Sequence, residues 1–266
     1  MSVVWNIARA TFKECVQKKV MWILFGVALV IIGLSFIFSF FAPSEKLVLI
    51  KSMGLGVIYL FGIVIALIVT AGLIPTEIER RTLHTVLSKP VERWQFVLGK
   101  FFGVALVLFM NMMIMGLALL IVVMAQGSVR AEGFFKALLT NSRILEATLL
   151  LFFYLLILVA FAILFSILTT TNISITLSAF ILVVGSLSDY VNALINASQN
   201  PVTQFLLKAI HLIVPNFGNA NIYNPVIHGY IPAGEFQYVL LAIAYTVAYT
   251  TIITVLSCWS FAGKEV

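Results

Sequence analysis

The stretch VMWILFGVALVIIGLSFIFSFFA, residues 20–42, carries no charged side chain. A helix needs about 20 apolar residues to cross the roughly 30 Å hydrocarbon core of a bilayer, so this stretch predicts a transmembrane helix. It is longer than the apolar region of a secretory signal peptide and starts late in the chain. No convincing small-residue cleavage site follows it. We therefore expect it to be retained as the first membrane span.

Similar apolar stretches recur along the chain. The chain has 266 residues, of which 62% are hydrophobic and 10% are charged, far from the composition of a soluble domain. None of the stretches alternates with the period of two that is typical of barrel strands, and helices satisfy their own backbone in lipid. We predict an all-α integral membrane protein, a single domain over residues 1–266, with six transmembrane helices at 20–42, 53–74, 101–125, 145–168, 173–187 and 237–260.

The segment before the first span, residues 1–19, predicts an amphipathic helix. Apolar side chains recur at helical spacing on one side, and basic and amide side chains fall on the other. Such a helix lies in the membrane interface. It either sets the topology as a basic surface helix or binds a partner, and its expected anchors are Trp5, Arg9, Phe12 and Lys13.

Residues 188–236 form a segment longer than a connector between two helices needs. Within it, residues 201–215 predict an amphipathic or partly re-entrant helix before the last span. His211 and His228 have no Cys, Asp or Glu at metal-ligand spacing, so we interpret them as surface histidines rather than metal ligands.

The distribution of Lys and Arg predicts the orientation. With the N-terminus in the cytoplasm, the shorter cytoplasmic segments carry more basic residues than the longer outer ones, as the positive-inside rule requires. Both termini are then cytoplasmic, and Cys15 and Cys258 lie on the reducing side. Basic segments that face anionic lipids explain the net charge of +6 without nucleic acid.

The predicted spans carry no Asp, Glu, Lys, Arg or His well inside, which argues against an ion-coupled transporter or pump. Asn111 is the amide near the middle of a span, and its expected role is an intramembrane hydrogen bond to another helix. We find no catalytic motif, no metal-ligand cluster and no P-loop, so we predict that the chain is not an enzyme and holds no cofactor or metal.

The stretch EIERRTLHTVLSKPVERWQFVLGK, residues 77–100, contains eight charged residues between two apolar spans. We predict a short helix over 77–88, ended by Lys89 before Pro90, within a cytoplasmic region over 75–100. Taken by itself, the charge of the stretch favours a solvated loop that only follows the positive-inside rule.

The same stretch resembles a family signature. The pattern Glu77-x-Glu79-x-x-Thr82-Leu83, then Leu87-Ser88-x-Pro90-Val91-x-Arg93, then Phe96-x-x-Gly99-Lys100, is similar to the segment between the second and third helices of ABC-2-type transporter permeases. Single-domain bacterial permeases related to copper-enzyme maturation and gliding-motility systems are the most similar. Many members have glycine where this chain has Arg81. The resemblance covers the whole chain in layout and these 24 residues in detail.

The resemblance implies a type V exporter-like fold in the bacterial inner membrane, in which two copies of this permease pair with two copies of a separate ATPase subunit. ATP and Mg would bind the ATPase, and accessory proteins could join. The implied coupling-helix contacts are Glu77, Glu79, Arg80, Arg81, Thr82, His84, Thr85 and Lys89. The turn before the fifth span implies a second, smaller contact through Thr170, Thr171 and Asn172.

Two other classes of function stay open from the sequence. The chain could anchor or assemble an ATPase complex that does mechanical work and moves no substrate. A passive channel or an intramembrane enzyme is less favoured, since both need polar groups at depth.

Overall fold

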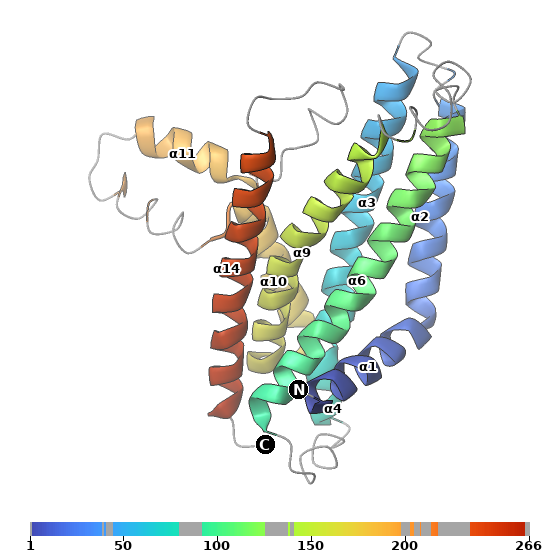
Figure 1. The fold of residues 1–266 in the computed structure, drawn as a ribbon. Coiled ribbons are helices and arrows are strands. Elements are labelled where there is room, and N and C mark those ends of the chain that lie inside the picture. Colours follow the sequence, from blue (N-terminus) through green and yellow to red (C-terminus); the bar gives the residue numbers. More distant parts are fainter. Residues whose placement is uncertain are drawn as a thin grey trace.

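The computed structural model describes residues 2–38, 40, 45–79, 92–125, 138, 141–197, 203–204, 208, 214–217 and 235–263. Helices make up the regular structure of these residues, which contain no strand. Five of the helices are long and apolar enough to cross a membrane, and one further apolar helix is shorter. Figure 1 shows a bundle with one helix, α1, lying across one end. The all-helical membrane fold is therefore confirmed.

The five long helices cover five of the six predicted spans. Their bounds are α2 Lys19–Phe38, α3 Lys46–Ala71, α6 Arg93–Val123, α9 Arg143–Leu168 and α14 Glu235–Ala262. The helices α3 and α4 are nearly continuous, because α3 passes through a turn at Gly72 into α4, Leu73–Glu79.

Several helices begin earlier than predicted. The helix expected to start at 53 starts at Lys46, and the one expected to start at 101 starts at Arg93. Hydropathy marks the part of a helix that suits lipid, whereas backbone hydrogen bonding continues into the charged flank. The helix predicted over 77–88 begins at Leu73 instead, with Pro75 in the first turn, where its missing N–H is tolerated. Residues 80–88 lie outside the described residues.

The predicted fifth span corresponds to α10, Thr171–Ser186, which has 16 residues. At 1.5 Å per residue this helix is about 24 Å long, less than the hydrocarbon core. A turn at Leu187 leads from it into α11, Ser188–Ala197, which extends away from the bundle (Figure 1). The chain thus changes direction near the end of α10, where the sequence predicts only that a long outer segment begins.

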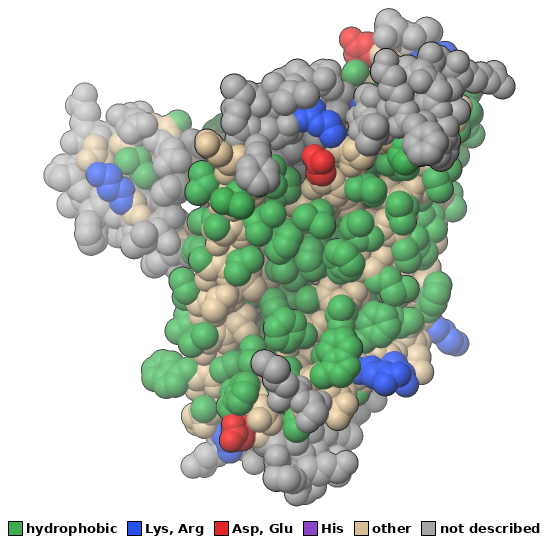
Figure 2. Space-filling model, viewed as in Figure 1, with side chains coloured by type: hydrophobic (Ala, Val, Ile, Leu, Met, Phe, Trp, Pro, Cys, Tyr) green, Lys and Arg blue, Asp and Glu red, His purple; other side chains and the backbone are tan. Residues whose placement is uncertain are grey.

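The core of the bundle forms around α9. This helix packs against α3, α6, α10 and α14, and 72% of its most apolar window is buried, against 22% for α2. Figure 2 shows hydrophobic side chains over the middle of one face, with charged side chains toward the two ends. A bilayer accepts such a surface, because lipid tails are as apolar as the side chains that they meet.

We call the two ends of the bundle the α1 end and the α11 end. The α1 end holds α1 (Ser2–Gln17), α4, the start of α6, the turn between α9 and α10, and the end of α14 (Figure 1). The predicted amphipathic helix is therefore present, and it packs against α6.

Glycine allows α1 and α6 to approach closely. A Cβ atom at Gly99 would lie 2.6 Å from the Cβ of Ile7, and one at Gly103 would lie 2.6 Å from the Cβ of Thr11 and 2.8 Å from the carbonyl oxygen of Ala8. These distances are far below van der Waals contact. The GKFFG sequence is thus a close-packing motif, with four-residue spacing that places both glycines on one face of α6.

Residues 214–217 return from the predicted outer segment to the bundle. The backbone N–H of Phe217 donates to the carbonyl of Gly185 at 3.1 Å, and the N–H of Asn216 donates to the Tyr245 hydroxyl at 3.0 Å. Most of the helix predicted over 201–215 lies outside the described residues. The described part thus joins the end of α10 to Tyr245, ten residues after the start of α14.

The packing of α1 on α6 makes a stability prediction. Gly103→Val is expected to destabilise the protein by about 2 kcal/mol, because the added methyl groups overlap Thr11 and Ala8. It should also expose Cys15, which is fully buried on α1. In a Cys258→Ser background, thermal unfolding and the rate of Cys15 alkylation measure both effects.

Gly33→Val is the matched control, since nothing lies within 4 Å of a Cβ atom at Gly33 on α2. Gly33→Val changes the helix propensity as Gly103→Val does, but its added Cβ atom meets no neighbouring side chain. Equal effects of the two substitutions on melting temperature and Cys15 alkylation would contradict the close-packing interpretation.

Candidate functional site

A buried lysine joins three helices at the α1 end. Lys100 of α6 is 4% exposed, and its Nζ lies 3.5 Å from Oε2 of Glu14 on α1. The same ammonium forms an ion pair and hydrogen bond with Oε1 of Glu77 on α4. It also lies 5.7 Å from the ring centroid of Phe96. A buried ammonium is strongly unfavourable unless it is paired, so these contacts explain why Lys100 can be buried.

The ion pairs continue onto the surface of α1. Glu14 also lies 3.9 Å from Lys18, one helical turn further along. Glu14 is about half exposed, whereas the side chain of Glu77 is only 20% exposed. Screening by solvent weakens the exposed pair, so the Lys100–Glu77 pair contributes more to holding the helices together. We call Glu14, Glu77 and Lys100 the ion cluster.

Cys15 lies beside the ion cluster on the buried face of α1. Burial raises the pKa of its thiol to about 11, with smaller opposing effects of Lys18 and Lys100 and a further increase from Glu14. The thiol therefore stays neutral at physiological pH and acts as a small apolar group in the packing of α1.

The start of α6 is fastened to the end of α14. Nη1 of Arg93 donates to the carbonyl oxygens of Phe261 and Ala262 at 3.3 Å and 3.0 Å. The rings of Phe96 and Phe261 are stacked, with centroids 5.7 Å apart. A cation at the C-terminus of a helix satisfies free carbonyls and complements the helix dipole. Both ends of the stretch over 77–100 are therefore attached to other helices.

The predicted second contact region lies near the junction of α3 and α4. A Cβ atom at Gly72, between α3 and α4, would lie 3.7 Å from Cγ2 of Thr171. The carbonyl of Thr170 accepts the N–H of Ser174 at 2.9 Å, so Thr170 begins α10, and Asn172 is exposed in its first turn. The structure thus brings Thr171 close to Gly72, although 99 positions in sequence separate them.

The predicted coupling contacts divide into two groups. Glu77 is directed into the bundle, toward Lys100, and Glu79 ends α4. The structure does not describe the side chain of Glu79. The remaining predicted contacts lie outside the described residues: Arg80, Arg81, Thr82, His84, Thr85 and Lys89. Their role at an interface stays a prediction.

The four predicted anchors lie along α1. Trp5 is 59% exposed, Arg9 and Lys13 are exposed, and Phe12 is half-buried against the core. Trp5, Arg9 and Phe12 line one hollow together with side chains of α6. Arg9 therefore lies beside apolar groups, whereas the helical spacing of the sequence predicts it on the opposite, polar side.

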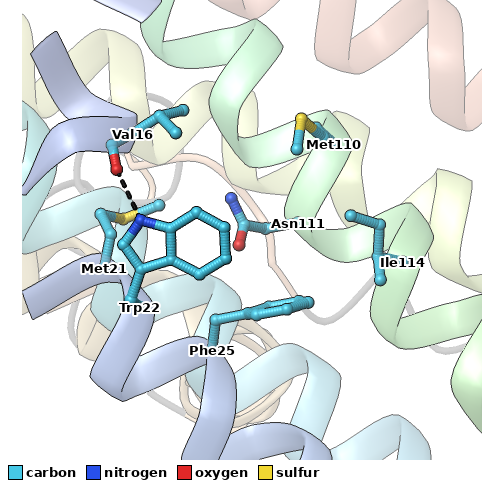
Figure 3. A pocket seen from close by; sticks show the side chains of 7 residues that line it. All are labelled: Val16, Met21, Trp22, Phe25, Met110, Asn111 and Ile114. Atoms are coloured by element: carbon cyan, nitrogen blue, oxygen red, sulfur yellow. Dashed lines mark hydrogen bonds between the residues drawn. The ribbon is translucent and has the colours of Figure 1, made fainter. Parts of the chain in front are cut away.

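Asn111 does not bond to another helix as predicted. Its Nδ2 donates to the carbonyl of Val107 in α6 at 2.8 Å. Figure 3 shows its side chain in a small hollow beside Trp22 and Phe25 of α2, and the Trp22 indole donates to Val16 at 2.9 Å. The adjacent wall is apolar, so the carbonyl four residues earlier in α6 is the acceptor that the amide uses.

Sequence reasoning misses the roles of Glu14, Lys100 and Arg93. Lys100 directly precedes an apolar span, and this position is typical of an interfacial lysine. The sequence signal that could have indicated a buried, paired Lys100 is its position between a glycine and a run of apolar residues, within the same motif as Glu77. Among the residues that the structure describes, no group of three His, Cys, Asp or Glu side chains forms a metal site.

The ion cluster makes a second prediction. Lys100→Met should destabilise the protein by about 3 kcal/mol, because it leaves two carboxylates without their shared cation. Adding Glu77→Gln should recover part of that loss, because the double variant removes the charge that Lys100 neutralises. Thermal unfolding of the two single variants and the double variant gives the coupling energy.

Lys13→Met serves as the control, since Lys13 is exposed on α1 and forms no ion pair among the described residues. It should change the melting temperature little. Additive effects of Lys100→Met and Glu77→Gln would show that the ion pair contributes no coupling.

A comparison with curated proteins finds no match. A family model, described as ABC-2 family transporter protein, matches residues 5–266, which include all or nearly all of every helix named above. The match confirms the resemblance and extends it from the motif over 77–100 to nearly the entire chain. The chain belongs to the ABC-2 family of transporter membrane proteins.

Proposed function

We propose that this chain is the permease subunit of an ATP-driven exporter, moved by a separate ATPase subunit that contacts residues 77–89. Family membership supports the permease role. The observation that carries the coupling role is the ion cluster, in which Lys100 pairs with Glu77, at the start of this stretch, and with Glu14 on α1. A solvated loop that served only to set topology would not need these ties.

The contacts define how a displacement would spread. Glu77 belongs to α4, which continues α3, and its ion pair reaches α6 and α1 through Lys100. Arg93 holds the end of α14. A force applied between Glu77 and Arg93 therefore acts on four helices together. Packed elements of this kind move as rigid bodies between discrete arrangements.

The partner follows from the same proposal. The charged side chains of the coupling stretch, with Arg80, Arg81 and Lys89 foremost, meet the ATPase, while Glu77 serves as the internal tether. Thr170, Thr171 and Asn172 supply the second contact, which is supported by the approach of Thr171 to Gly72, where α3 passes into α4. Two permeases and two ATPase subunits form the complex. ATP and Mg bind the ATPase subunits.

The orientation is part of the proposal. The α1 end, with both termini and the coupling stretch, faces the cytoplasm of a bacterial cell, and the α11 end faces outward. This agrees with the excess of Lys and Arg at the α1 end. The sixth crossing of this proposal is α10, an apolar helix of 16 residues.

The proposal predicts the loss of a specific partner. Intact chain, purified from native membranes in mild detergent, should capture a P-loop ATPase. The double reversal Glu79→Arg, Arg81→Glu should reduce capture at least tenfold, because like charges then face each other across the interface. Capture is measured by identification of the bound proteins and by ATPase activity.

Lys46→Glu is the control, since it reverses a charge at the α11 end and should leave capture unchanged. If the intact chain captures no ATPase, the exporter proposal loses its energy source. If an ATPase is captured but its reconstituted activity drives no transport, the mechanical-anchor function replaces the exporter.

A further inference from the structure

An apolar groove opens where α1 crosses α6. One hollow of about 550 Å³ is lined by Trp5, Arg9 and Phe12 of α1 and by Leu106, Phe109 and Met110 of α6. The three α1 residues are spaced by four and three positions, so they share one face of that helix. The α6 residues are likewise neighbours on one face, about one turn beyond Gly103.

A second hollow of about 540 Å³ adjoins the first. It shares Trp5 and Leu106 with the first hollow and extends along α6 past Phe102 and Leu98 to Trp94. Together the two hollows form what we call the α1–α6 groove. Its α6 wall runs from Trp94 to Met110, which is about 24 Å at 1.5 Å per residue.

The chemistry of the groove is apolar except at one position. Among the described lining residues, Arg9 carries the only charge. Phe102, Phe109 and Met110 are between 39% and 49% exposed, so the chain itself does not cover this wall. In a membrane protein the material that covers such a wall is lipid hydrocarbon.

The charge of Arg9 is not neutralised by the described part of the chain. Arg9 forms no ion pair there, although Lys18 and Lys100 do. The acids of this end whose side chains are described are engaged elsewhere: Glu14 and Glu77 pair with lysines, and Glu92 accepts the Trp94 indole N–H. A guanidinium beside an apolar wall is favourable when an anion from outside pairs with it.

The position of Arg9 selects the kind of anion. α1 lies across the end of the bundle, where an amphipathic helix meets the boundary between headgroups and acyl chains (Figure 1). A lipid there can place its phosphate at Arg9 while an acyl chain extends along Leu106, Phe109 and Met110 toward the middle of the membrane. No soluble anion would use the apolar wall.

The geometry points to the α1–α6 groove as a binding site for one anionic phospholipid of the adjacent leaflet, with its phosphate on Arg9 and an acyl chain along α6. Trp5 and Trp94 flank the site with indole rings, which suit this depth of the membrane. The site requires no ATPase and stands whether or not the chain is an exporter.

The tryptophans make the test direct, because bromine atoms on an acyl chain quench a nearby indole. A variant that keeps Trp5 alone, with Trp22→Phe, Trp94→Phe and Trp259→Phe, is placed in phosphatidylcholine vesicles. These contain a minor fraction of brominated phosphatidylglycerol or of brominated phosphatidylcholine. We expect Trp5 to report an affinity about fivefold higher for the anionic lipid.

Arg9→Gln should abolish that preference, whereas Lys13→Gln should retain it, since Lys13 lines neither hollow. A variant that keeps Trp259 alone, which is 78% exposed on α14, should not respond to Arg9→Gln and shows that the protein is inserted. Native mass spectrometry of the unmodified chain and of Arg9→Gln, after purification with phosphatidylglycerol, gives an independent count of retained lipid.

The site is overturned if Trp5 is quenched equally by the two lipids, or if the preference survives Arg9→Gln. Loss of the preference with Lys13→Gln to the same degree would also overturn it, since diffuse surface charge would then explain the result. Equal retention of phosphatidylglycerol by the unmodified chain and by Arg9→Gln in the mass spectrometer would overturn it as well.

Discussion

The burial of one ammonium group constrains the whole α1 end. Lys100 lies eight positions into α6 and is almost inaccessible to solvent, so its charge must be paired inside the protein. The partners are Glu14 of α1 and Glu77 of α4, and Glu14 reaches Lys100 because α1 packs closely on α6. Gly99 and Gly103 allow this close packing, because side chains at these positions would collide with α1. The GKFFG sequence thus supplies both the buried charge of Lys100 and the glycines that let α1, with Glu14, approach α6.

The rest of the bundle follows the rule that lipid, rather than water, is the solvent. In lipid, helices gain little from hiding apolar surface, so close packing and backbone satisfaction decide which helix lies inside. Well-fitted side chains place α9 at the centre, while α2 stays peripheral although it is nearly as apolar. The hydroxyls of Thr148 and Ser166 on α9 bond to carbonyls of their own helix, at 2.7 Å and 2.8 Å, and so remain satisfied at depth.

Local physics explains what the sequence can predict. Apolar runs locate the membrane helices, and the motif over 77–100 identifies the family, because both are properties of consecutive residues. The ion cluster depends on the return of the chain from α4 into α6 and on the crossing of α1, and hydropathy contains no information on either. The same limit explains Arg9, which helical spacing assigns to the polar face, although the neighbour that matters is α6 rather than water. The prediction for Asn111 is wrong because a carbonyl of its own helix lies within reach of the amide, whereas the adjacent wall of α2 is apolar.

The ion pairs and hydrogen bonds at the two ends of the coupling stretch involve only some of the described helices. At the described ends of this stretch, the ion cluster joins α4, α6 and α1, and Arg93 joins α6 to α14. A device that rotated the central helix would need its strongest contacts there. These described ion pairs and hydrogen bonds lie instead on helices around α9, so under the proposed coupling a displacement would act on these helices first. The α1–α6 groove lies between two of these helices, so a lipid bound there would contact both α1 and α6.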